Sequence, residues 1–134
     1  MFKLVFLSSL VIPVPAQPLM DRNISCLKTL LYNEARYESI EGKIAVINVV
    51  QNRAKVFNTD FCNVIYQKNQ FFVKKKEFRL ENRYDIEIDA LSRNYYILPN
   101  IVGQSLFFKR KKHYSHFFKK LKKIKKIGNH EFFQ

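Results

Sequence analysis

Two consecutive stretches of helical pattern, residues 27–35 and 42–56, constrain the fold of this 134-residue sequence more than any other feature. In the first stretch, apolar residues recur at steps of three and four positions, which is the spacing of an amphipathic helix. We expect this helix to start near residue 26, after a polar lead-in over residues 21–25 that supplies its cap.

The second stretch is rich in β-branched residues, among them Ile44, Val46 and Ile47, which suit a strand by propensity. The pattern nevertheless continues through residues 42–56 without a turn signal, and that length favours a helix buried on most sides. Ser39 is its predicted N-cap.

The later part of the sequence predicts shorter elements. We expect a helical turn over residues 61–66, an extended piece over 70–73, a surface loop over 74–84, a third helix over 85–97, and strands near 104–108 and 128–133 that pair with each other. The predicted fold class is therefore α+β, mostly helical with a small antiparallel sheet, in a single domain.

The net charge of +13 is unevenly placed, because residues 109–126 carry ten Lys and Arg and no acid. Such a run indicates a polyanionic partner: nucleic acid, anionic lipid or an anionic wall polymer. As a helix, the run would place Phe117, Leu121 and Ile124 on one side and lysines on the other, as in helices that lie on anionic surfaces. The alternative is a solvated basic face over a core contact.

The first sixteen residues have the features of a secretory signal. Lys3 precedes an apolar run over residues 4–14, and small residues place the expected cleavage after Ala16. The mature domain would then span residues 17–134 and act as a secreted, periplasmic or cell-envelope protein, where no nucleic-acid partner is expected. The alternatives are a buried N-terminal strand and an uncleaved anchor.

The sequence contains two cysteines, Cys26 and Cys62. In an exported chain they can form a disulfide, which would stabilise the fold by about 4 kcal/mol in the chain-entropy treatment. Two buried thiols are the alternative.

Two carboxylates near the end of the first helical stretch are candidates for chemistry. Glu34 follows the apolar stripe, and a carboxylate desolvated by apolar neighbours retains its proton more readily, as a general acid must. The alternative is an ion pair with Arg36, Lys28 or Arg53 on a wet face. Glu38 shares the same face and is either a second catalytic carboxylate or a charge at the helix end.

Other catalytic arrangements find less support. His113, Ser115 and His116 lie within the basic run, where cation binding is disfavoured, and neither a zinc site nor a serine nucleophile is complete there. No metal or other cofactor is therefore expected. Oxidation on export also makes a cysteine nucleophile improbable.

Several ordered blocks together carry a resemblance to a known family. They are Leu-Tyr-Asn-Glu-Ala-Arg over 31–36, Glu-Gly-Lys-Ile-Ala-Val over 41–46, Val-Val-Gln-Asn-Arg over 49–53, Cys-Asn-Val-Ile-Tyr-Gln over 62–67 and Ile-Gly-Asn-His-Glu-Phe-Phe over 127–133. In this order and spacing they resemble the SleB-type cell wall hydrolases, the spore cortex-lytic enzymes and their bacterial and phage relatives. The resemblance covers residues 26–133 and is strongest in 26–72 and 127–133.

The resemblance implies a lysozyme-like, lytic-transglycosylase-like fold and peptidoglycan as substrate. The Glu of the Glu-Ala-Arg motif, Glu34, would be the single catalytic acid and base, cleaving the glycosidic bond after N-acetylmuramic acid to give a 1,6-anhydro product. Further motif positions are expected to bind substrate or support the site: Arg36, Glu38, Asn52, Arg53, Gln70 and His130.

The sequence departs from the family in several places. Tyr37 stands where the family usually has Gly, Phe72 follows Gln70-Phe71, there is no Trp, and the basic run replaces a loop. Two alternatives stay open: an N-acetylmuramoyl-L-alanine amidase, which usually needs zinc, and a non-enzymatic basic protein that binds the wall or a membrane. A small basic enzyme without a separate wall-binding domain would suit a phage lysin.

Overall fold

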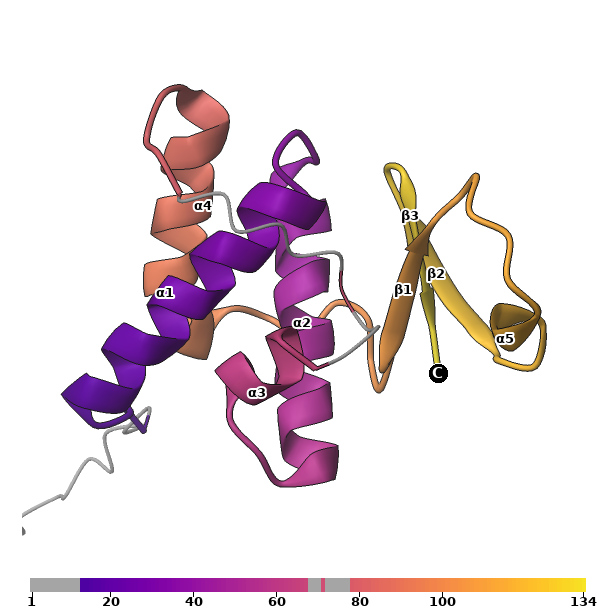
Figure 1. Ribbon diagram of the computed structural model, residues 1–134, viewed down its shortest axis with the longest axis horizontal. Coiled ribbons are helices and arrows are strands. Elements are labelled where there is room, and N and C mark those ends of the chain that lie inside the picture. The colour runs from indigo at the N-terminus through magenta and orange to yellow at the C-terminus, as the bar shows by residue number, and fades with distance from the viewer. Residues whose placement is uncertain (1–12, 68–70, 72–77) are drawn as a thin grey trace, which may run out of the picture.

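The computed structural model of the protein describes residues 13–67, 71 and 78–134. Along the chain these residues form α1 (Gln17–Glu34), α2 (Ile40–Phe57), α3 (Phe61–Ile65), α4 (Arg83–Arg93), the 3-10 helix η1 (Tyr95–Ile97), β1 (Phe107–Arg110), α5 (His116–Lys119), β2 (Lys123–Ile127) and β3 (His130–Phe133). The helices α1 to α4 gather at one end of the molecule and the sheet stands at the other, beside α2 (Figure 1). The predicted α+β class, mostly helical with a small antiparallel sheet, is confirmed.

Some predicted segments fall outside the described residues. These are residues 1–12 of the expected signal, most of the extended piece predicted over 70–73, and the part of the expected surface loop at 74–77. In the described part of the chain, no helix combines the length and the apolar character that crossing a bilayer requires.

The first helix begins earlier than predicted. The residues expected to form a polar lead-in are part of α1, which starts at Gln17. Pro18 lies in its first turn, where a backbone N–H would have no partner within the helix, so the missing N–H of proline costs nothing there. Asn23 is buried and its Nδ2 donates to the Tyr95 hydroxyl at 2.9 Å, so this polar side chain serves a tertiary contact instead of a cap. The predicted cap within residues 21–25 was therefore wrong.

The helix predicted for the second stretch is confirmed as α2. Ser39 caps it, because its Oγ accepts a hydrogen bond from the Gly42 amide at 3.1 Å. Most of its central turns are inaccessible to solvent, since Ala45, Val46 and Ile47 are 0% exposed. Tertiary burial of this kind overrides the preference of β-branched residues for strands.

The predicted disulfide is also present. Cys26 of α1 is bonded to Cys62 of α3, across a sequence separation of 36 residues. It fastens the short α3, which has only five residues, to the 18-residue α1.

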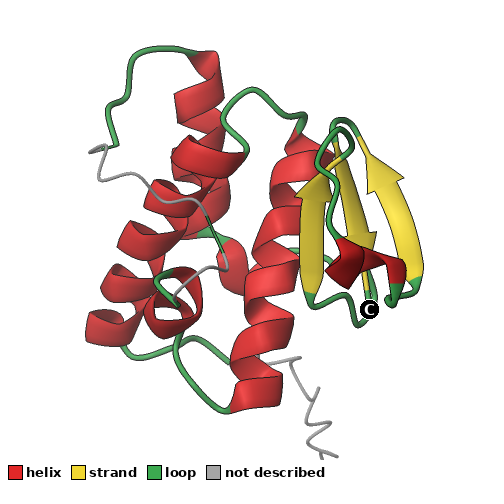
Figure 2. Cartoon of the chain, turned by 45° about the vertical axis from the view of Figure 1, so that its right-hand side comes forward, coloured by secondary structure: helices red, strands yellow, loops and turns green. Residues whose placement is uncertain are grey.

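The sheet has the order β1-β3-β2, and all neighbours are antiparallel. The expected pairing of the last strand with the strand near residue 107 is confirmed, with Phe108 opposite Phe132. The basic run does not adopt the helical form considered for it, because residues 109–126 divide into the end of β1, a turn, the four-residue α5, and β2 (Figure 2). A continuous helix would have stacked lysines at three- and four-residue spacing, which is repulsive.

Aromatic contacts explain the packing of α5. The ring of Phe117 lies 5.0 Å from Phe107, and that of Phe118 lies 5.0 Å from Phe133. These contacts hold α5 on one face of the sheet. Phe132, on the central strand β3, is fully buried.

A comparison of two glycines tests how the sheet meets the helices. Gly128 and Gly103 both have positive φ values, of 56° and 57°. A Cβ at Gly128 would collide with Oε2 of Glu38, whereas a Cβ at Gly103 would meet no atom within 4 Å. We expect Gly103→Ala to cost about 1 kcal/mol of unfolding free energy through backbone strain alone. Gly128→Ala should cost about 0.5–1 kcal/mol more, because the Glu38 carboxylate, at the end of a flexible side chain, must turn away from the Asn129 amide to make room.

Urea denaturation of both variants measures the difference. Adding Glu38→Ala to Gly128→Ala should remove the additional loss of unfolding free energy, because it removes the side chain with which the new methyl collides. Equal losses for the two glycine variants would contradict a close contact between Glu38 and the β2–β3 turn.

Candidate active site

An open cleft lies between the C-terminal end of α1 and the edge strand β1, with a volume of about 1660 Å³. One wall consists of the last residues of α1 and the loop that follows. The other wall consists of β1 and the turn after it. The lining comprises Tyr32, Asn33, Glu34, Ala35, Arg36, Tyr37, Glu38, Arg53, Phe71, Leu106, Phe107, Phe108, Lys109, Arg110, Lys111, Lys112, His113, Ser115, Phe117, Phe118 and Asn129.

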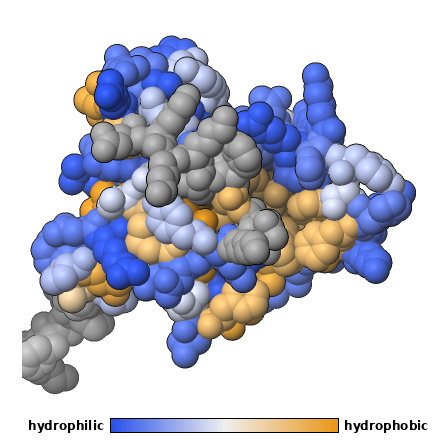
Figure 3. All heavy atoms as spheres, viewed as in Figure 1, coloured by the Kyte–Doolittle hydropathy of each residue, from blue (hydrophilic) through white to orange (hydrophobic). Residues whose placement is uncertain are grey.

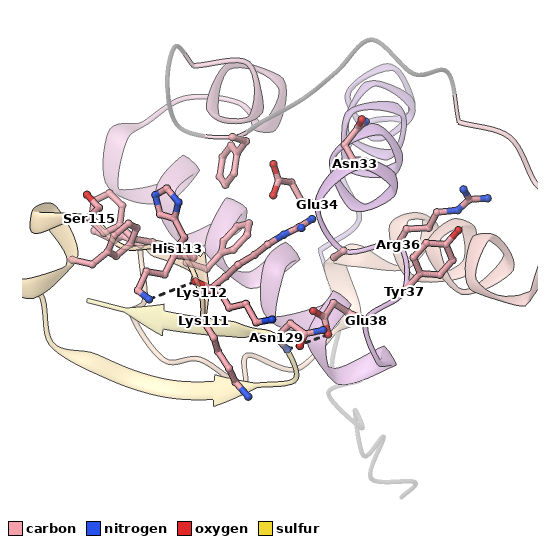
Figure 4. Close-up of a pocket in the computed structure, with 18 of the residues that line it drawn as sticks. Asn33, Glu34, Arg36, Tyr37, Glu38, Lys111, Lys112, His113, Ser115 and Asn129 are labelled. Atoms are coloured by element: carbon pink, nitrogen blue, oxygen red, sulfur yellow. Dashed lines mark hydrogen bonds between the residues drawn. The ribbon is translucent and has the colours of Figure 1, made fainter.

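Glu34 is the last residue of α1, and its carboxylate projects into the cleft toward the wall that carries His113 (Figure 4). The side chain is half-buried. Behind it, Leu30 and Leu31 are fully buried and Ala35 is 2% exposed, so the backbone that carries Glu34 is anchored in the core. A carboxylate held this way at the edge of apolar surface can exchange a proton with a ligand in the cleft.

Glu38 also lines the cleft but is engaged by the β2–β3 turn. Its Oε2 accepts a 3.5 Å hydrogen bond from the Asn129 amide, and its Oε1 lies 3.5 Å from Nδ1 of His130 (Figure 4 shows the first contact). The side chain therefore connects the loop after α1 to the sheet.

His130 is 1% exposed and packs its ring 5.1 Å from Phe108. Burial lowers the pKa of this imidazole, and the nearby Arg110 acts in the same direction, while Glu38 opposes them. The net lowering means that His130 is neutral at pH 7.

Arg36 points away from Glu34 and toward α4 (Figure 4). Its Nε and one terminal nitrogen donate to the two oxygens of Asp85, at 2.9 and 3.0 Å. Burial of Asp85 favours its neutral form, but the hydrogen bonds from Arg36 and from the amides of Glu81 and Asn82 outweigh burial and lower the pKa of the carboxyl. The pair fixes the loop after Glu34 against the start of α4.

Lys43 makes a second connection between the same loop and α4. Its fully buried ammonium donates to the backbone oxygen of Glu38 at 2.6 Å and to the carboxylate of Glu87 at 2.9 Å. Nothing in the sequence pattern had singled out this lysine, because a lysine in an apolar helix is usually exposed.

Asn52 and Arg53 hold the chain that leads into β1. The amide of Asn52 donates to the backbone oxygens of Gly103 and Ser105, at 2.8 and 2.9 Å. Arg53 donates to the backbone oxygen of Leu106 at 3.1 Å and to Oε1 of Gln67 at 2.8 Å. Burial lowers the pKa of the Arg53 guanidinium.

The structure brings most of the predicted site residues to one region. Glu34, Arg36, Glu38 and Arg53 all line the cleft. The remaining three are placed differently: His130 lies behind Glu38, Asn52 supports β1 from α2, and Gln70 falls outside the described residues.

Tyr37, the departure from the family pattern, lies at the rim of the cleft. Its ring is 67% exposed and meets Tyr84 edge to face at a centroid distance of 5.3 Å. Its bulk is therefore accommodated on the α4 side, beside Arg36 (Figure 4).

Sequence reasoning missed the wall formed by β1. Hydrophobic side chains gather around this strand and hydrophilic ones surround them (Figure 3), and Phe107 and Phe108 are among those that line the cleft. The adjoining basic residues Lys109 to Lys112 line the same wall. The only sequence signal for this wall was the predicted strand near residues 104–108, which by itself does not indicate that the strand lines a cleft. In the described parts of the chain, no three His, Cys, Asp or Glu side chains come together as a metal site would require.

The ion pair beneath the loop provides a stability test. Asp85 is fully buried, whereas Glu81, the other carboxylate near Arg36, is 56% exposed and 3.5 Å away. We expect Asp85→Asn to lower the unfolding free energy by about 1.5–3 kcal/mol, because it removes the charged acceptor of two hydrogen bonds from the partly buried Arg36. Glu81→Gln should cost less than about 1 kcal/mol, as exposed pairs do. Urea denaturation measures both, and similar losses would contradict the role given to Asp85.

His130 provides a pH test. Its folded-state pKa lies below the unfolded value of about 6.5, so the unfolded chain binds more protons between the two values. The stabilisation is complete above pH 6.5 and is lost as the pH falls through the folded-state pKa. We expect the unfolding free energy to decline between pH 7 and 5, with a slope of at most about 1.4 kcal/mol per pH unit.

The change His130→Phe should remove most of that slope, because the new ring does not titrate. His113→Gln, at an exposed position, should retain it. Asp85, Asp89 and Glu131 have lowered pKa values and so titrate below this range. Denaturation curves at pH 7.5, 6.5 and 5.5 make the comparison, and an unchanged slope in His130→Phe would contradict a buried neutral histidine.

Comparison with known proteins agrees with this architecture. The structure resembles the crystal structure of the catalytic domain of the Bacillus cereus SleB protein, with a TM-score of 0.67, 23% identity, and coverage of 91% of this chain and 94% of that one. It also resembles the catalytic domain of the germination-specific lytic transglycosylase SleB from Bacillus anthracis, with a TM-score of 0.67, 21% identity, and coverage of 91% and 99%. A search of curated protein sequences found no match.

These likenesses confirm the predicted lysozyme-like fold. The sequence itself matches the family described as Cell Wall Hydrolase over residues 37–133. The matched segment contains the last three residues of the loop after α1, all of α2, and the complete sheet, but it begins three residues after Glu34. Because the match covers most of the chain, this protein belongs to the cell wall hydrolase family.

Proposed function

We propose that the protein cleaves the glycan strands of peptidoglycan next to N-acetylmuramic acid as a lytic transglycosylase, with Glu34 as the general acid and base. One observation carries this proposal: Glu34 ends a core-anchored helix with its carboxylate directed into the cleft. The SleB domain named a lytic transglycosylase, which shares the fold, supports it.

The chemistry requires one carboxylate in two successive roles. Protonated Glu34 donates its proton to the glycosidic oxygen as the bond from that oxygen to the anomeric carbon breaks. The resulting carboxylate then accepts the proton of the muramic acid 6-hydroxyl while that oxygen bonds to the anomeric carbon. The products are a free hydroxyl on the leaving sugar and a 1,6-anhydro sugar, and Glu34 regains its proton without consuming water.

The surroundings of Glu38 favour this route over an inverting hydrolysis. An inverting enzyme needs a second carboxylate that is available to activate water. Glu38 is the other carboxylate among the described residues that line the cleft, and it is occupied by the Asn129 amide and the His130 ring. Its role would then be to support the site, and Arg36, Asn52, Arg53 and His130 would support it through the contacts described above.

The amidase alternative ranks lower for a reason of ligand geometry. Zinc hydrolases hold the metal with several protein ligands. The described residues assemble no group of three potential ligands, and the two exposed histidines His113 and His116 lie among lysines. The non-enzymatic alternative, a basic protein that binds the wall or a membrane, predicts that Glu34 is dispensable.

Peptidoglycan as substrate implies action outside the cytoplasm. The Cys26–Cys62 disulfide fits such a compartment, because these bonds persist where conditions are oxidising. A signal over residues 1–16 would deliver the domain there. The basic residues of 109–126 would retain it on an anionic wall polymer or membrane surface.

Digestion of purified peptidoglycan by wild type and two matched variants tests the proposal. We expect Glu34→Gln to lower the rate of glycan cleavage by about 10²–10⁴-fold, because an amide cannot exchange the proton. Glu38→Gln removes an identical charge one turn away and should retain much more activity.

Mass spectrometry of the released muropeptides identifies the bond. Anhydro-muropeptides are the expected products, whereas reducing ends would indicate hydrolysis and free stem peptides would indicate an amidase. If Glu34→Gln cleaved glycan at the wild-type rate and its thermal unfolding were unchanged, the catalytic role of Glu34 would be contradicted. The basic residues would then be the source of any lysis.

A further inference from the structure

The two walls of the cleft carry charges of opposite sign. Glu34 and Glu38 lie on the α1 side, and four successive cations from Lys109 to Lys112 lie on the β1 side. Figure 4 shows Glu34 and Glu38 across the cleft from Lys111 and Lys112. A substrate that reaches Glu34 therefore passes along a strongly positive surface.

Most of the cations on this wall lie outside the ion pairs that the described residues form, although Glu38 and Glu131 are near enough to act on Lys111. Lys109 is neutralised by Glu131, 3.7 Å away, and Glu131 is also paired with Lys123. Arg110, Lys111 and Lys112 are exposed, and none of them forms an ion pair with another described residue. These three residues, which we call the cationic wall, are free to bind a ligand.

The fold also brings a further cation close to one residue of the cationic wall. The strand order places β1 and β2 on either side of β3, and Lys111 meets Lys126 at the end of β2. The closeness of the Lys126 ammonium lowers the pKa of Lys111. Like charges held side by side are repulsive, and an anion bound between them relieves that repulsion.

We propose that the cationic wall binds free carboxylates of the stem peptides, so that the enzyme prefers glycan strands whose stem peptides are not amidated. This inference rests on the proposed function. Each muramic acid of the substrate carries its peptide close to the bond that Glu34 would cleave, and unamidated peptides bear several carboxylates. Arginine and lysine bind carboxylates through charge-assisted hydrogen bonds, and the guanidinium of Arg110 can donate two such bonds to one carboxylate.

The rest of the basic run allows a matched control. Lys120, Lys122 and Lys125 are exposed, belong to the same segment and do not line the cleft. Replacing either set with glutamine removes three positive charges. Any difference in strand preference between the two triple variants is therefore caused by where the charges lie and not by the net charge.

The test measures kcat/KM on two soluble glycan strands of equal length, one with free stem-peptide carboxylates and one with amidated stem peptides. For wild type at low salt, we expect a preference of about fivefold to tenfold for the acidic strand, from three contacts of the strength that exposed ion pairs have. The preference should shrink at 0.5 M salt, where the screening length falls well below 10 Å.

The Arg110→Gln, Lys111→Gln, Lys112→Gln triple variant should lose that preference, mainly through a higher KM for the acidic strand, so that its kcat/KM values on the two strands become equal. The Lys120→Gln, Lys122→Gln, Lys125→Gln variant should keep the preference. Thermal unfolding of each variant checks its folding. Equal cleavage of the two strands by wild type would overturn the proposal, as would equal losses in the two triple variants.

A binding experiment separates this inference from the catalytic proposal. Titration of Glu34→Gln with each strand measures affinity without turnover. A preference for the acidic strand that disappears in the cationic-wall variant supports the inference even if the products prove not to be anhydro sugars. Binding that depends instead on phosphodiester polymers left on the wall preparation, with no response to amidation, would overturn it.

Discussion

Two cation–carboxylate pairs hold the loop that follows Glu34, and the geometry of the cleft depends on them. Arg36 reaches the buried Asp85, and Lys43 joins the backbone oxygen of Glu38 to Glu87. Each pair spans more than forty positions in sequence, because α4 supplies both acids. Buried pairs of this kind are costly to break singly, so the loop and α4 should keep or lose their structure together.

The opposite end of the same loop connects to the sheet. Glu38 contacts the β2–β3 turn closely enough that only glycine fits at position 128 without displacing its carboxylate. The two walls of the cleft are therefore joined by one short segment that carries the candidate acid at its start. Such a connection limits how far the sheet can move from α1, and general acid catalysis depends on that separation.

The basic residues of the sheet and its connections lie in two different environments. The strand β1 contributes aromatic rings and cations to the cleft, while the remaining lysines of the basic run face solvent on α5 and β2. The lysines and arginine of residues 109–126 therefore lie in two environments, which the composition of the segment does not distinguish. Residues 109–112 are placed to act on a ligand beside Glu34, whereas the lysines beyond them are placed to act on surfaces outside the cleft.

The sequence by itself determined α2, with its Ser39 cap, from a local pattern, and it indicated the two segments that pair as β1 and β3. The ordered motif blocks identified the family, the fold and the candidate acid, and an even cysteine count anticipated the disulfide. Only the tertiary structure decided that Asn23 donates to Tyr95 and caps no helix, and that residues 109–126 divide among β1, the short α5 and β2 and form no continuous helix. It also directed Arg36 toward Asp85. The contacts of Asn23 and Arg36 lie 72 and 49 positions away, and the strands of the basic run depend on pairing with β3, so the residue spacing within each segment does not reveal these outcomes.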